Sequence, residues 1–148
     1  MKKLLSFISA VLCLFLIIGS VLPTFAYAQE NKTSIINLKV NDLKEPVGIS
    51  TDNINFSWQM ESKVRGEMQR AYQILVSADE SFEDLLWDSK KVESDVSLNI
   101  RYKGKKLEDL HEYYYKFIVW NKDNINLFSE TSSLITGLNS KDSWNKSK

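Results

Sequence analysis

The sequence of 148 residues predicts an all-β fold, a sandwich of seven short strands that follows an export signal. Runs rich in Val, Ile, Phe, Tyr and Trp recur along the chain with turn residues between them. None of these runs keeps a helical spacing of apolar residues long enough to predict a major helix. The length fits one domain, and a hydrophobic fraction of 43% is typical of a chain that folds around a packed core.

The first 28 residues have the composition of a secretory signal peptide. The basic start Met1-Lys2-Lys3 is followed by an uncharged apolar stretch, Leu4–Leu22, after which Pro23 ends any helix. Ala26-Tyr27-Ala28 places small residues where signal peptidase requires them, so we expect cleavage after Ala28 and a secreted mature protein. The apolar stretch is also about long enough to span a bilayer. An uncleaved anchor is therefore the alternative, which the Ala-x-Ala site disfavours.

The single cysteine, Cys13, lies inside the predicted signal peptide. Val11 and Leu12 precede it in place of the small residues of a lipoprotein signal, so we expect no lipid attachment. Cleavage after Ala28 removes the apolar stretch, so we also expect no stable membrane insertion of the mature protein. The mature domain is therefore expected to be stable without disulfide bonds.

After the cleavage site the chain divides into a flexible leader (residues 29–33), a domain (residues 34–138) and a C-terminal tail that resembles an interdomain linker (residues 139–148). The strands predicted within the domain are Ile35–Val40, Ile54–Met60, Ala71–Ala78, Leu86–Lys91, Ser97–Ile100, Tyr113–Asn121 and Leu134–Thr136. Turn chemistry separates them, for example around Gly48. The one plausible helical turn is Ser81–Leu85, where Ser81 is a candidate N-cap.

The stretch Tyr113–Trp120 alternates with the period of two that a β-strand requires. Its odd-numbered positions are predicted to face the core and its even-numbered positions to face outward. In Ala71–Ser77 the same logic places Tyr72, Ile74 and Val76 in the core, and it places Gln73, Leu75 and Ser77 on a partly wet face. Trp58 is expected in the core together with Phe56.

Seven strands over about 100 residues resemble the immunoglobulin-like sandwich, and the fibronectin type III variant is the most similar. Trp58 on the second strand, Tyr72 at the start of the third, and Leu107 six residues before Tyr113 carry this resemblance. The last pair resembles a tyrosine corner, which implies that the Tyr113 phenol hydrogen-bonds backbone just upstream. These four residues are therefore expected to be structural.

A narrower resemblance extends over nearly all of the chain after the signal peptide. The segments that carry it are, in order, Ile36–Val40, Phe56–Gln59, Gln69–Val76, Leu86–Asp95, Tyr102–Gly104, Tyr113–Trp120, Thr136–Leu138 and Asp142–Trp144. They are similar to the N-terminal domain of bacterial α-L-rhamnosidases, with Lys90 and Tyr115 standing where Gly and Trp are usual. In those large glycoside hydrolases the acid and base carboxylates lie in a catalytic barrel far downstream. The resemblance therefore implies an accessory domain, whether truncated or independently encoded, without catalytic residues.

Residue types that carry chemistry are sparse or explained by solvation. Lys plus Arg equals Asp plus Glu at 19 each, so no charge imbalance favours nucleic acid. His111 is the only histidine, which excludes a zinc site with several imidazoles. Asp79, Ser81 and Glu83 have the alternate spacing of a calcium loop but lack its glycine and its bidentate glutamate.

The carboxylates expected on the solvated surface are Asp79, Glu80, Glu83, Asp84, Glu93, Asp95, Glu108 and Asp109. We therefore expect no catalytic, cofactor-binding or metal-binding residue, and no cofactor.

Aromatic residues are the remaining functional candidates, because both sugar rings and protein partners pack on exposed indoles. The candidates are Trp87, Trp120 and Trp144, and the first two are expected to line one exposed sheet face or to cover the sandwich edge. The favoured interpretation is a secreted, non-catalytic module that packs against the catalytic domain of a rhamnosidase-like enzyme. The alternative is a small carbohydrate-binding or cell-surface interaction module that binds a glycan through exposed Trp.

Overall fold

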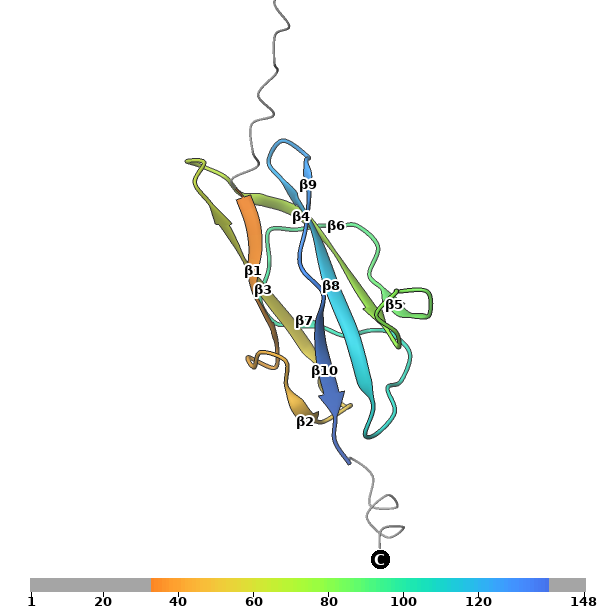
Figure 1. The fold of residues 1–148 in the computed structure, drawn as a ribbon. Coiled ribbons are helices and arrows are strands. Elements are labelled where there is room, and N and C mark those ends of the chain that lie inside the picture. Colours follow the sequence, from red (N-terminus) through yellow and green to blue (C-terminus); the bar gives the residue numbers. More distant parts are fainter. Residues whose placement is uncertain (1–32, 139–148) are drawn as a thin grey trace, which may run out of the picture. The chain divides into compact units, whose positions relative to one another are not determined.

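The computed structural model describes residues 33–138, which contain β-strands and no helix. The strands are β1 (Thr33–Val40), β2 (Val47–Ile49), β3 (Asn55–Ser62), β4 (Gln69–Ser77), β5 (Leu85–Asp88), β6 (Val92–Glu93), β7 (Ile100–Arg101), β8 (Glu112–Asn121), β9 (Asn126–Phe128) and β10 (Ser132–Thr136). They form a β-sandwich (Figure 1), which confirms the predicted fold class. The predicted signal peptide, nearly all of the leader and the tail lie outside the described residues. Within the described range, no segment has the length, apolarity and helical form needed to cross a bilayer.

The smaller sheet has the strand order β1-β3-β7, and the larger has the order β2-β10-β8-β4-β5, with β6 paired to β4 and β9 paired to β8. Neighbouring strands are antiparallel except β2 and β10, which run parallel. A register shift interrupts the β1–β3 ladder between Ile36 and Lys39, where Asn37 has a φ of 51°. β2 pairs only with Ile135 and Thr136, so the first part of β10 has no strand on that side. The sandwich therefore has two unpaired edges, one between β1 and the first part of β10 and one between β5 and β7.

Each of the seven predicted strands overlaps an observed one, but β2, β6 and β9 are not predicted. They have three, two and three residues, which is too short for a period of two to stand out. Gly48, which suggested a turn, has a φ of 78° inside β2. The predicted strand Ser97–Ile100 overlaps β7 only at Ile100. The Ser97 carbonyl does accept the backbone N–H of Trp58 at 3.0 Å. Asn99, however, has a φ of 55° and donates its backbone N–H to the Ser57 hydroxyl at 3.1 Å, which interrupts the pairing with β3.

The core lies between the sheets and is centred on β8. The odd-numbered residues from Tyr113 to Val119 are buried and the even-numbered ones are partly exposed, as the alternation predicts. Trp58 packs against Phe117 at a ring-centroid distance of 4.6 Å. Ser77 departs from the prediction of a partly wet face: it is fully buried, and its hydroxyl donates to the Asp84 carbonyl at 2.8 Å.

The predicted helical turn at Ser81–Leu85 is wrong. Phe82 has a φ of 63°, which a right-handed helix does not permit. The Asp79 carboxylate accepts the backbone N–H groups of Glu83 at 3.3 Å and Asp84 at 2.8 Å, and also the Ser81 hydroxyl. An aspartate upstream of the expected cap therefore satisfies these donors and holds the segment as a tight turn between β4 and β5.

Candidate functional site

Trp58 lies at the centre of the sandwich and is only 1% exposed. Its indole Nε1 donates to the side-chain oxygen of Gln69 at 2.9 Å. The Gln69 amide in turn donates to the carbonyls of Ser94 and Val96, at 3.1 and 3.0 Å. The buried indole thus has its polar atom satisfied, and Gln69 ties it to the irregular segment that follows β6. Tyr72 packs edge-on to the same indole at 5.3 Å.

The Tyr113 hydroxyl accepts the backbone N–H of Glu108 at 2.8 Å, five residues upstream. Leu107, next to that N–H, is 3% exposed. Burial raises the pKa of Tyr113, which keeps the phenol neutral. Thr136 completes the same corner, because its hydroxyl donates to the Glu108 carbonyl at 2.6 Å and accepts the backbone N–H of His111 at 2.9 Å. The sequence offers no signal for this role of Thr136.

Trp87 closes the β5–β7 edge of the sandwich. Its ring stacks on Phe56 at 6.0 Å and meets Tyr102 edge-on at 5.2 Å. A Cβ atom on Gly104 would come within 2.5 Å of the Trp87 Cβ, so only glycine fits at this close approach. The Tyr102 hydroxyl donates to the Lys105 carbonyl at 2.7 Å, and burial raises the pKa of Tyr102 to about 12. Beside this cluster lies a hollow of about 400 Å³.

Trp87 and Trp120 do not share a face. Trp87 is the register partner of Val76, which is fully buried on the inner face, whereas Trp120 is the partner of Ala71 on the outer face of the same sheet. The expectation that both line one exposed sheet face is therefore wrong, because the register of β5 against β4 sets the side to which Trp87 points. Trp144, the third candidate, lies outside the described residues.

One face of the Trp120 indole is covered by Lys91, whose Nζ lies 4.9 Å from the ring centroid. Lys91 is itself held there by Glu93 at 3.1 Å and by the Asn124 side-chain oxygen at 3.0 Å. Trp87 therefore packs on core rings, and one face of the Trp120 indole is covered by an ammonium group.

The carboxylates with shifted pKa values are engaged in hydrogen bonds within the fold. The Ser81 hydroxyl and the backbone of Asp84 hold the pKa of Asp79 well below its usual range. Partial burial acts to raise the pKa of Asp88, but hydrogen bonds from Lys90 and Gln73 outweigh it and lower that pKa. Over residues 33–138, no three His, Cys, Asp or Glu side chains converge in a way that would hold a metal ion.

His111, the lone histidine, is exposed. Its ring lies 5.5 Å from that of Tyr113, and its Nδ1 lies 3.9 Å from a Glu108 carboxylate oxygen. This position is at the tyrosine corner, where the Glu108 carboxylate and the Thr136 hydroxyl are its polar neighbours.

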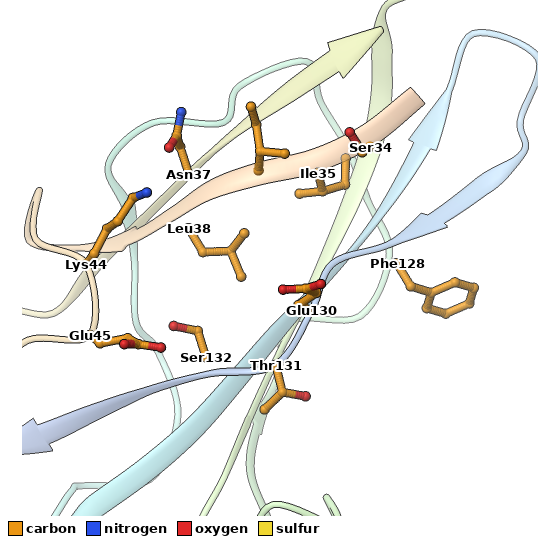
Figure 2. A pocket seen from close by; sticks show the side chains of 11 residues that line it. Ser34, Ile35, Asn37, Leu38, Lys44, Glu45, Phe128, Glu130, Thr131 and Ser132 are labelled. Carbon is orange, nitrogen blue, oxygen red and sulfur yellow. The ribbon is translucent and has the colours of Figure 1, made fainter. Parts of the chain in front are cut away.

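A groove of about 620 Å³ runs along the other unpaired edge, between β1 and the segment Phe128–Ser132 (Figure 2). Leu38 points into it from β1, and Glu130 and Ser132 face Leu38 from the opposite side. Lys44 and Glu45 lie at one end, and Phe128, which is 64% exposed, lies at the other. Sequence reasoning missed this groove, because it is formed where β1 and β10 fail to pair.

Tyr115 on β8 is the register partner of Ser132, one of the residues that line this groove. Tyr115 is fully buried, and its hydroxyl has no hydrogen-bond partner among the described residues. Burial raises the pKa of Tyr115. Of the groove-lining residues, the Glu45 carboxylate raises that pKa further and the nearby Ser132 hydroxyl opposes the rise.

Comparisons with known proteins place this sandwich in one family. The family model described as the Rha78A-like, N-terminal immunoglobulin domain matches residues 35–140. An α-L-rhamnosidase of Formosa agariphila is 35% identical over 120 residues, a match that covers 77% of this chain and 12% of the relative. An α-L-rhamnosidase of Streptomyces avermitilis is 33% identical over 109 residues, covering 71% of this chain and 10% of the relative.

Solved structures show the same relationship. The crystal structure of the Streptomyces avermitilis α-L-rhamnosidase complexed with L-rhamnose superposes with a TM-score of 0.72 at 30% identity, covering 76% of this chain and 11% of that one. The α-L-rhamnosidase from Dictyoglumus thermophilum gives a TM-score of 0.69 at 30% identity, covering 75% and 13%. The chain spans only about an eighth of the length of these relatives. It belongs to the family of Rha78A-like N-terminal immunoglobulin domains, the domain that it shares with these α-L-rhamnosidases.

Proposed function

We propose that this chain is an exported, non-catalytic accessory module of an α-L-rhamnosidase, and that it packs against the remaining polypeptide of such an enzyme. The observation that supports this most is coverage: the relatives match over most of this chain, yet the match takes up 10 to 12% of their length. Glycoside hydrolysis requires two carboxylates that flank the scissile bond in a cleft. Asp79 and Asp88 are instead held by hydrogen bonds within the fold. The module is therefore expected to position and stabilise the rest of the enzyme.

The end of the sandwich where β10 finishes carries exposed apolar side chains suited to this docking. Val47 is 75% exposed and is the register partner of Ile135 near the end of β10. Leu110 is 65% exposed and precedes β8, whose first residue Glu112 also pairs with Ile135. In a rhamnosidase the polypeptide continues beyond this N-terminal domain, so it passes this end. Exposed apolar groups beside a chain exit favour an interdomain interface.

The test uses a rhamnosidase polypeptide from which the N-terminal immunoglobulin domain has been deleted. Adding the purified protein is expected to raise the melting temperature of that polypeptide, because a partner that binds only the folded state stabilises it by mass action. The variant Val47→Asp/Leu110→Asp is expected to lose this effect. Met68→Asp is the matched control, since Met68 is 62% exposed but precedes β4 at the opposite end of the sandwich. No stabilisation by the unaltered protein would contradict the docking role.

The purified protein alone is expected not to hydrolyse an aryl α-L-rhamnoside. Uncatalysed glycoside cleavage is so slow that even a poorly placed acid and nucleophile would give measurable turnover. Turnover that disappears when one Asp or Glu is changed would overturn the non-catalytic assignment. Glycan binding through Trp87 or Trp120 is less well supported than docking, because Phe56 and Lys91 already occupy those rings.

A further inference from the structure

The groove along the β1–β10 edge has the lining of a small-molecule site. Its volume of about 620 Å³ lies within the range of roughly 300–1,000 Å³ that such sites occupy. Hydroxyl groups come from Ser34, Thr131 and Ser132. The amide of Asn37, which also lines the groove, already donates to the Gln59 side-chain oxygen at 2.6 Å. Leu38 in the middle supplies apolar surface, and the exposed Phe128 adds apolar surface at one end (Figure 2). A ligand that fits must therefore present both hydrogen-bonding groups and C–H faces.

The charges of the groove disfavour an anion. Glu45 and Glu130 supply two carboxylates against the single ammonium of Lys44. None of these three side chains takes part in an ion pair within residues 33–138, so all three are available to a ligand. Carboxylate oxygens accept hydrogen bonds from hydroxyl groups, whereas a phosphate or a uronic acid would meet repulsion there.

A buried polar group provides a second argument for ligand binding at this edge. The Tyr115 hydroxyl is shielded from solvent and makes no hydrogen bond of normal geometry in the described part of the chain, although the Ser132 side chain lies close enough to lower its pKa. A buried hydroxyl without a well-formed hydrogen bond is rare, because leaving one unmade is costly. Tyr115 is the register partner of Ser132, which lines the groove. Besides burial, the two side chains that shift its pKa are Ser132 and Glu45, and Glu45 is also a lining residue. A hydroxyl group that enters between them would reach the phenol and give it a partner.

An extended peptide strand suits this groove less well. A strand that joins a sheet needs a regular row of backbone donors and acceptors along the free edge. The edge offered by β1 is broken by the register shift between Ile36 and Lys39, with Asn37 in a left-handed conformation. Bulges of this kind protect an edge from strand addition.

We propose that the groove between β1 and Phe128–Ser132 binds a neutral pyranose unit of a glycan chain. The carboxylates and hydroxyl groups of Glu45, Glu130 and Ser132 contact the sugar hydroxyls. Leu38 and Phe128 contact the apolar face of the ring. This binding goes beyond the docking role and does not depend on it, because the isolated domain carries all of the lining.

The test begins with a glycan array that holds neutral and acidic oligosaccharides. The neutral oligosaccharide that gives the strongest signal is then titrated into the ¹⁵N-labelled protein, without any rhamnosidase polypeptide. Chemical-shift changes are expected in Ser34–Leu38 and Phe128–Ser132. Glu130→Gln and Tyr115→Phe are each expected to weaken binding by about three- to tenfold, the loss of one net hydrogen bond. Trp120→Phe, on the outer face, is the control that should leave affinity unchanged.

Three results would overturn the proposal: no binding by any neutral oligosaccharide, a preference for acidic ones, or shifts that centre on Trp120. Shifts in the groove caused only by the rhamnosidase polypeptide would also overturn it, and would instead identify the groove as a protein interface. Thermal melting of each variant shows that it is folded. Ser132→Ala, at a partly exposed position, provides a second reading if Tyr115→Phe does not fold.

Discussion

The two unpaired edges of the sandwich are filled in opposite ways. At the β5–β7 edge, Trp87 stacks on Phe56, Tyr102 meets it edge-on, and Gly104 lets the backbone approach the indole. At the β1–β10 edge, polar side chains surround a groove of about 620 Å³, larger than the hollow of about 400 Å³ beside Trp87. The hydroxyl of Tyr115, whose register partner Ser132 lines the groove, makes no hydrogen bond of normal geometry within the described residues.

The two edges therefore have different expected roles: the β5–β7 edge stabilises the fold, and the β1–β10 edge is the proposed binding site. Aromatic closure buries apolar area and fixes the distance between the sheets, so the β5–β7 edge contributes to folding. The β1–β10 edge gives up such burial and keeps unpaired carboxylates and hydroxyl groups at the surface. A site that has not been optimised for stability is where a binding function is expected. Of the indoles that suggest sugar binding in the sequence, Trp87 belongs to the structural edge and Trp120 is covered on one face by a lysine.

The largest expected effect is at the closed edge. Trp87→Ala should lower the free energy of unfolding by about 3 kcal/mol, because it removes a ring that packs on two aromatic neighbours. Leu38→Ala at the open edge is the matched comparison and should cost only about 1 kcal/mol, since Leu38 is partly exposed in the groove. Urea unfolding of both variants measures the difference. Equal losses would show that the two edges contribute alike.

The tyrosine corner should contribute less. Tyr113→Phe removes the acceptor of the Glu108 N–H and is expected to lower the free energy of unfolding by about 1–2 kcal/mol. The same urea titration measures it. A neutral result would show that water replaces the phenol at this backbone group, and that Thr136 alone holds the corner.

The sequence predicts strands and buried residues best where the alternation of side chains extends over many positions. β8 has ten residues, and its odd-numbered positions are buried as the alternation predicts. Strands of two or three residues leave no period to detect, so β2, β6 and β9 appear only in the structure. The turn at Asp79 is missed for another reason: Ser81 has the right type for an N-cap, but a carboxylate two residues earlier reaches the same backbone donors.

The candidate site is less predictable than the fold. Which face Trp87 occupies depends on its register with Val76, and the sequence of β5 alone does not contain that information. The groove is formed by Leu38 and Ser132, which are far apart in sequence and which meet because two strands do not pair. Serine, threonine and glutamate in a connecting segment are typical of a solvated loop, so composition gives no warning of a site.

A smaller effect on stability is expected when the pH is lowered, because of Asp79 in the turn between β4 and β5. The pKa of Asp79 is lowered in the folded state, so its ionised carboxylate stabilises the fold above the unfolded pKa of about 3.9, and this contribution is lost as the pH falls toward the folded value. The unaltered protein should therefore lose more stability between pH 6 and pH 3 than Asp79→Asn does. Urea midpoints at both pH values test this. Parallel losses in the two proteins would show that other carboxylates dominate.

The smallest effect on stability is expected at Tyr115, in contrast to Tyr113 two residues earlier on the same face of β8. Tyr115→Phe removes a buried hydroxyl that has no partner in the described part of the chain, so the free energy of unfolding should stay within about 0.5 kcal/mol or rise slightly. Urea unfolding beside Tyr113→Phe provides the comparison, since both changes remove one phenol oxygen from a buried ring. A loss as large as that of Tyr113→Phe would mean that the Tyr115 hydroxyl is already paired in the free protein, through Ser132 or an ordered water. It would then be unavailable to a ligand, and the contrast between a closed structural edge and an open binding edge would rest on the groove lining alone.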